Sequence, residues 1–284
     1  MKKNPQVLVP VFLISLLMLA ALTYAASNKL RSSNTTTKNP AAGEGANLQN
    51  GNRSSYLQRS VLSPKLVWHL KALGDRLEKP GRERLSLTGT LANDSQSHAV
   101  AAVLEFPDRL RLTMQTGAGN RVITFDGDQS KAAANSLNTA EQDLIETLVY
   151  DTPEHFFTTQ MQGLATRFLG SRFRIDDGSA SDYSGPYYDV YKVADQVKTS
   201  TAQREQLKLY YFNSDTLLLE RVAYEITRNG SVINVEERIS NWTTEQGQQV
   251  ARRIERFENG KSVFVLTVHT AGLSARLDDG VFAN

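Results

Sequence analysis

The chain has 284 residues, 40% of them apolar, which is enough for one large or two ordinary domains with a hydrophobic core. Its 32 basic and 30 acidic residues nearly balance, which argues against nucleic acid as a partner. The absence of cysteine excludes disulfide bonds, a thiolate nucleophile and a lipid anchor attached through cysteine.

The N-terminus has the layout of a secretory signal. Lys2 and Lys3 precede an apolar run over residues 7–22, and small residues follow it. This pattern predicts export, with either cleavage after Ala25 or retention of residues 1–26 as a membrane anchor, because the run is close to the roughly 20 residues that span a bilayer. Removal of the signal would leave equal numbers of basic and acidic residues.

Residues 27–60 are rich in Ser, Asn, Thr and Gly and contain few large apolar residues, which predicts a flexible linker. The folded domain is therefore expected over residues 61–284. It begins with an amphipathic helix, because apolar residues recur at helical spacing over residues 61–77. Pro64 suits the first turn of this helix, and Gly81 is the expected end.

Short strands follow this helix, since side chains that alternate along a strand point to opposite faces. Leu110, Leu112 and Met114 share one face, whereas Arg109 and Arg111 lie on the other. The strands expected in this half of the domain are 84–91, 99–106, 109–114, 121–125 and 131–135.

Two helices are expected next. Thr139 and Gln142 form a capping-box pattern, and Pro153 suits the first turn of a second helix. The apolar residues of the first helix are Leu144, Ile145, Leu148 and Val149. The second helix carries a stripe formed by Phe157, Met161, Leu164 and Phe168, with Gly170 as its expected C-terminal cap. Such a stripe is typical of a core and, less often, of a ligand wall.

The last third of the chain is predicted to be an antiparallel meander. Asn229-Gly230 and Asn259-Gly260 supply the positive φ angles of two-residue hairpin turns. The strands expected in this half are 172–175 and 187–193, followed by a strand from Leu207 and by 222–226, 231–242, 249–258 and 261–271. Together with the helices they predict an antiparallel α+β class.

The order of several short motifs resembles the LolA/LolB-like superfamily of bacterial periplasmic lipoprotein carriers and receptors. A proline-led strand starts at Phe106-Pro107-Asp108, and a turn at Asp126-Gly127 follows it. The resemblance extends over most of residues 61–284. It implies an incomplete antiparallel β-barrel of about 11 strands wrapped over a few helices, with an apolar pocket for acyl chains between sheet and helices.

The resemblance implies a pocket wall built from apolar residues of strands and helix. These are Leu104, Phe106, Leu110, Leu112, Met114, Phe157, Met161, Leu164 and Phe168. The carriers have a basic residue before the proline that fastens a helical lid, and Phe106 occupies that position here. Arg109 or Arg111 is the candidate contact for a lid or head group. The residues alone are equally consistent with a filled core.

No pattern of catalytic residues is present. The four histidines His69, His98, His155 and His269 are isolated in sequence and lack the spacing of metal ligands. Asp176-Asp177-Gly178 and Asp278-Asp279-Gly280 are typical of turns. There is no nucleophile elbow and no phosphate-binding loop. We therefore expect a protein without enzymatic activity, cofactor or metal.

The sequence thus predicts an exported cell-envelope protein of the periplasm that binds a lipid or an acylated lipoprotein, with a carrier or sorting role. The alternative is a regulatory or scaffold domain of the same fold, which acts through contacts with an inner-membrane protein while its pocket is closed.

Overall fold

The computed structural model describes most of the C-terminal part of the chain. The chain divides after Asn52 into two units, and all described residues belong to the second unit. They are residues 62–74, 76–78, 81–127, 129–132, 137–161, 166–175, 185–198, 203–275 and 279–282. The predicted signal and linker, residues 1–60, lie outside the described residues. Within the described ranges, no helix combines the length and apolarity needed to cross a membrane.

The described residues form one antiparallel sheet of twelve strands. The strands are β1 Arg84–Ala92, β2 Ser97–Glu105, β3 Arg109–Thr116, β4 Gly119–Asp126, β5 Gln129–Ala132, β6 Thr166–Phe173, β7 Tyr188–Lys198, β8 Gln203–Asn213, β9 Leu219–Arg228, β10 Ser231–Glu245, β11 Gln248–Glu258 and β12 Lys261–Ser274. Their order is β5-β4-β3-β2-β1-β12-β11-β10-β9-β8-β7-β6, so β5 and β6 are the two edges and do not pair with each other. The open barrel is confirmed, with twelve strands in place of about eleven.

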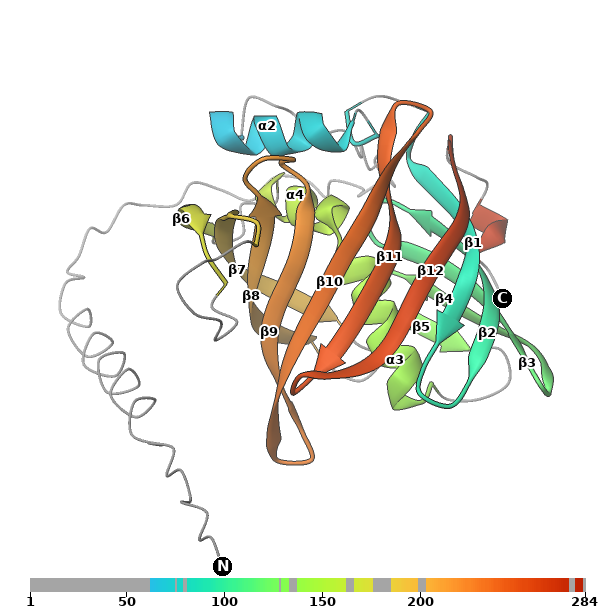
Figure 1. Cartoon of the computed structure of the whole chain (residues 1–284). Helices are drawn as coiled ribbons and strands as arrows, with labels where there is room; N and C mark the ends of the chain where they lie inside the picture. Colours follow the sequence, from blue (N-terminus) through green and yellow to red (C-terminus); the bar gives the residue numbers. More distant parts are fainter. Residues whose placement is uncertain are drawn as a thin grey trace, which may run out of the picture. The chain divides into compact units, whose positions relative to one another are not determined.

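Two meanders make up this sheet. The first contains β1 to β5, and the second contains β6 to β12 (Figure 1). The antiparallel pairing of β1 with β12, from Arg84 opposite Ser274 to Ala92 opposite Val265, joins them. The predicted hairpin turns are confirmed, because Asn229 and Asn259 have positive φ angles of 52° and 49° and each precedes a glycine with positive φ.

Helix α2, Pro64–Leu73, crosses one end of the sheet (Figure 1). Its first turn is as predicted, since Pro64 is the first helical residue and the Ser63 hydroxyl accepts a hydrogen bond from the amide of Leu66. The helix ends at Gly74, earlier than the predicted Gly81. Gly74 has φ 110°, and a Cβ there would lie 2.4 Å from the Gln248 side chain, so this position requires glycine.

The central helices are α3, Thr139–Ile145, the π-helix η2, Glu146–Tyr150, and α4, Pro153–Met161. The predicted capping box is displaced by one residue. The side chain of Asn138 accepts from the amide of Glu141, and the Glu141 carboxylate accepts from the amide of Asn138. Asn138 is therefore the cap, and Thr139 is the first helical residue.

The predicted helix over the Phe157–Phe168 stripe is wrong at Phe168. Phe168 and Gly170 belong to strand β6, which pairs with β7. Phe168 lies opposite Tyr191 in that ladder, and their ring centroids are 4.9 Å apart. Cross-strand pairing has therefore overridden the helical spacing of these apolar residues. Leu164 lies outside the described residues.

Candidate functional site

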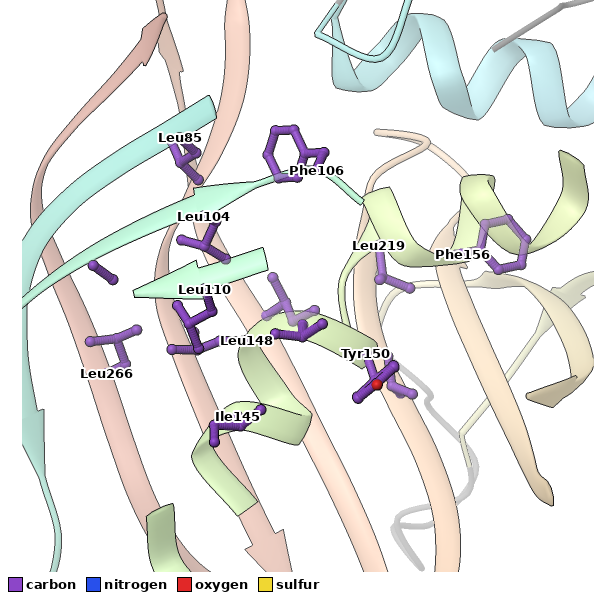
Figure 2. Close-up of a cluster of buried hydrophobic side chains, with 14 of the residues drawn as sticks. Leu85, Leu104, Phe106, Leu110, Ile145, Leu148, Tyr150, Phe156, Leu219 and Leu266 are labelled. Atoms are coloured by element: carbon purple, nitrogen blue, oxygen red, sulfur yellow. The ribbon is translucent and has the colours of Figure 1, made fainter. Parts of the chain in front are cut away.

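The helical segment from α3 to η2 lies on the sheet and presents a different chemistry on each of two sides. Leu144 and Leu148 are buried against apolar side chains, whereas Asp143, Thr147 and Asp151 meet charged side chains of the sheet. Both sets are spaced four residues apart, as expected of neighbours on one helical face. Figure 2 shows the apolar side, with Leu148 facing Leu104 and Leu110 of the sheet.

A surface cleft of about 600 Å³ lies where α3 meets the turns at one end of strands β1 to β4. Its outer lining is polar and includes Asn93, Gln96 and Thr116, while Leu91, Met114 and Leu144 are the large apolar residues of its lining. Arg121 and Glu141 pair in this lining, with Nε donating to Oε1 at 2.7 Å and Nη2 donating to Oε2 at 3.0 Å. The cleft thus combines a polar rim with apolar residues.

Apolar contacts continue from the cleft into the interior, and we call this region the apolar seam. Leu91 and Leu144 line both the cleft and the narrow part of the seam, where no water-sized space remains. Leu87 and Leu148 line both that narrow part and an inner cavity of about 60 Å³. The other residues of the narrow part are Val100, Ala102, Leu112 and Leu266. The seam therefore leads from the cleft to the inner cavity and is closed in between.

The other side of the helical segment is held by buried charges, which we call the polar clamp. Asp143 accepts hydrogen bonds from Arg228 at 2.8 Å and from Arg256 at 3.2 Å. Thr147 donates to Glu237 at 2.7 Å, and Arg256 donates to the same carboxylate oxygen at 3.0 Å. Burial raises the pKa of Glu237 to about 8 although Arg256 acts in the opposite direction.

The clamp continues to the start of α4 through a buried lysine. Lys208 lies 2.8 Å from Asp151 and 2.9 Å from Asp195, and these two carboxylates hold its pKa above the usual value against the effect of burial. His155 contacts Asp195 at 2.9 Å. Burial alone would raise the pKa of Asp195, but Lys208 and His155 hold it well below the usual value. The hydroxyl of Tyr224 donates to Asp151 at 2.7 Å.

Four of the five residues predicted for the sheet wall of the pocket lie along the cleft and the seam. Leu104 and Phe106 line the inner cavity, Leu112 lines the narrow part, and Met114 lines the cleft. Leu110 is buried in the adjoining core and does not line these three cavities.

The predicted helical residues lie elsewhere or are not described. Phe157 packs against Phe156 and Phe212, whose ring centroids are 5.3 Å and 6.2 Å away. Phe168 lies on β6, and the side chain of Met161 is outside the described part of the structure. The helical wall of the seam comes instead from Leu144 and Leu148. Their spacing after a capping box was visible in the sequence, but the predicted wall was placed on the following helix.

Arg109 and Arg111 contact the C-terminal segment. The guanidinium of Arg109 lies 4.4 Å from the ring centroid of Phe282, and Arg109 also pairs with Asp126 at 3.0 Å. Arg111 donates to the carbonyl of Val281 at 2.6 Å. Both arginines alternate with the buried Leu110, so they lie on the sheet face opposite α3 and α4.

Two histidines make buried polar contacts. His155 meets Asp195 as described above, and Nδ1 of His69 donates to the carbonyl oxygen of Leu217 at 3.0 Å. Burial lowers the pKa of His69. Among the described residues, no three His, Cys, Asp or Glu side chains gather in the arrangement of a metal site.

The chain is similar in structure to proteins of known fold. A LolA superfamily protein from Nitrosomonas europaea is 11% identical, with a TM-score of 0.53 over 78% of this chain and 99% of that chain. A domain from Vibrio parahaemolyticus named for outer membrane lipoprotein sorting and a DUF1329 family protein from Desulfovibrio piger are each 9% identical, with TM-scores of 0.46 over 77% of this chain and 94% of theirs. No protein-family model and no curated protein matches the sequence. The fold is LolA-like.

Proposed function

We propose that this protein binds an acyl chain of a lipid or of an acylated lipoprotein in the apolar seam and serves as a carrier or sorting protein of the cell envelope. The observation that carries the proposal is the continuity of the cleft with the seam through Leu91 and Leu144. An amphiphile needs a polar surface beside an apolar interior, and this path offers both.

The size of the cleft supports a ligand of this kind. Its volume of about 600 Å³ falls within the 300–1,000 Å³ that ligand pockets commonly have. The polar rim suits a head group, and the narrow part of the seam beyond Leu144 is lined only by aliphatic side chains. Affinity would come from apolar area removed from water, at about 25 cal/mol per Å².

Entry of an acyl chain requires the seam to open, and the polar clamp explains how the fold can allow this. Asp143 and Asp151 are paired with buried cations, so the charged side of the helical segment is costly to separate from the sheet. Leu144 and Leu148 on the other side line the narrow part of the seam together with aliphatic side chains of the sheet. An acyl chain would replace these contacts with similar ones, so displacement of this side costs little net burial.

The proposed location follows from the N-terminal sequence and the fold. The apolar run at residues 7–22 predicts export to the periplasm, with tethering to the inner membrane if the run is retained. The fold is shared with a protein of the LolA superfamily. In this setting the seam would shield acyl chains from water during their movement between membranes.

Mass spectrometry of organic extracts tests the proposal. Residues 53–284 would be purified from bacteria without detergent, and we expect lipid at about one equivalent. Leu91→Asp places a charge at the half-buried entrance and should abolish the lipid, whereas Leu207→Asp changes a residue that is 53% exposed and should leave it. A clean extract together with no binding of a fluorescent fatty acid would refute the proposal.

One observation favours the alternative of a regulatory or scaffold domain. The seam is closed between Leu87 and Leu91, as that alternative requires. Such a domain would form a stable complex with an inner-membrane protein, and its partner would co-purify from membranes without extractable lipid. The same purification therefore distinguishes the two functions.

A further inference from the structure

A second feature, separate from the seam, lies where helix α2 meets edge strand β6 (Figure 1). Lys65 joins the two elements, because its ammonium donates to the Ser171 hydroxyl at 2.6 Å and lies 5.4 Å from the ring centroid of Phe168. Lys65 also pairs with the buried carboxylate of Asp189 at 2.9 Å. The outward side chains of α2 and β6 are thereby held next to each other.

This surface exposes large apolar side chains between cations. Trp68 is 56% exposed, and Phe168 and Phe173 are also exposed. Lys71, Arg167 and Arg172 are exposed cations on the same two elements. The α2–β6 surface is defined by Trp68, Lys71, Arg167, Phe168, Arg172 and Phe173.

The charges of this surface have one sign. Helix α2 and strand β6 carry four basic residues between them and no acidic residue. Lys65 is already paired with Asp189, and the exposed cations of the two elements are Lys71, Arg167 and Arg172. Aromatic rings with interspersed Lys and Arg are the composition that partitions to the headgroup region of an anionic membrane.

The position of α2 in the chain agrees with a membrane as the occupant. The apolar run at residues 7–22 precedes Pro64 by about 40 residues, and a chain of this length would span about 35 Å if it forms the linker that the sequence predicts. A bilayer that retains this run would lie within reach of α2. We propose that the α2–β6 surface docks on the anionic surface of a lipid bilayer, with Trp68 at the headgroup level.

Trp68 itself can report on docking. The chain has two tryptophans, so Trp242→Phe leaves Trp68 as the single emitter in the full-length protein. In vesicles that contain brominated phosphatidylglycerol we expect a blue shift and loss of more than half of the emission, and little change in phosphatidylcholine vesicles. Subtraction of the Trp68→Phe spectrum from that of the wild type gives the same signal without changing Trp242.

A matched control places the reporter at the far end of the sheet. Val232 on β10 is 60% exposed, similar to Trp68, and lies opposite Thr227 near the end of β9. His69 of α2 contacts Leu217 at the other end of that strand, so the two positions are separated by about 30 Å of strand. The emission of Val232→Trp, in a chain that also carries Trp68→Phe and Trp242→Phe, should be unaffected by the same vesicles.

The charges are tested by Lys71→Gln, Arg167→Gln and Arg172→Gln combined. Each cation contributes about fivefold near an anionic surface, so the apparent affinity of the Trp68 reporter should fall roughly 100-fold. Fatty-acid binding by the seam should persist in this variant. Three results would overturn the membrane assignment. They are an absence of Trp68 quenching in anionic vesicles, equal quenching of a tryptophan at position 232, and a shift of the Trp68 emission only with lipid-free envelope protein.

Discussion

Leu148→Ala should lower the stability of the protein and yet strengthen its binding of acyl chains. Leu148 is 2% exposed and lines both the narrow part of the seam and the inner cavity. The substitution removes three buried carbon atoms, which costs about 2.4 kcal/mol in transfer free energy at about 0.8 kcal/mol per carbon. The cavity left behind raises the total cost toward about 5 kcal/mol if the seam does not collapse.

A bound acyl chain would recover part of this cost, because it would occupy the space vacated by the leucine side chain. Recovery of about 1.4 kcal/mol tightens binding about tenfold. We would measure unfolding in urea by circular dichroism, and binding by titration of residues 53–284 with a fluorescent fatty acid.

Leu70→Ala is the matched control. Leu70 on α2 is fully buried, and it does not line the cleft, the seam or the inner cavity. The same three carbons are removed, so a similar loss of stability is expected with unchanged affinity. Weaker binding by Leu148→Ala, or an equal change in affinity in both variants, would refute the reasoning that the chain lies in the seam.

Three further predictions concern the clamp and the helix cap. Lys208→Met leaves Asp151 and Asp195 buried without their cation and should lower the free energy of unfolding by about 3–5 kcal/mol. Substitution of the exposed Lys192 by Met should change it little, and a loss below about 1 kcal/mol in Lys208→Met would contradict the role of the clamp. Because the pKa of Glu237 is raised from 4.5 to about 8 in the folded protein, its contribution to the free energy of unfolding falls as pH rises between these values, by up to about 1.4 kcal/mol per pH unit. Glu237→Gln should remove this fall. If the free energy of unfolding of the variant and of the wild type changed in parallel with pH, this prediction would be contradicted. Asn138→Ala should lower the free energy of unfolding, measured in urea, by about 1 kcal/mol, and Thr139→Ala should lower it much less. A larger loss in Thr139→Ala than in Asn138→Ala would indicate that Thr139 is the cap.

Local turn chemistry made the hairpins of the meander predictable. Asn229-Gly230 and Asn259-Gly260 specify their turns within two residues, and the flanking strands follow. The helix predicted at Phe168 is wrong for the opposite reason. Its helical spacing after Phe157 is a local signal, and the pairing with Tyr191 that overrides it joins residues far apart in the chain.

The polar clamp could not be predicted for a related reason. Along β8, alternation of apolar and polar residues would place Leu207 inside and Lys208 outside, and the structure shows the reverse. Lys208 can be buried because Asp151 and Asp195 arrive from two other elements. A single strand carries no information about partners 57 residues away.

The pairing of β1 with β12 sets the order in which the molecule can be completed. Arg84 and Ser274, whose side chains meet at 2.7 Å, are 190 residues apart in sequence. During synthesis from the N-terminus the chain can form the first meander early. The edge of β1 that pairs with β12 has no partner, however, until this last strand has been made. The final closure is thus a long-range step of the kind that slows folding. Until then the exposed β1 edge can pair with other chains, so newly made molecules need protection for as long as their own C-terminus is missing.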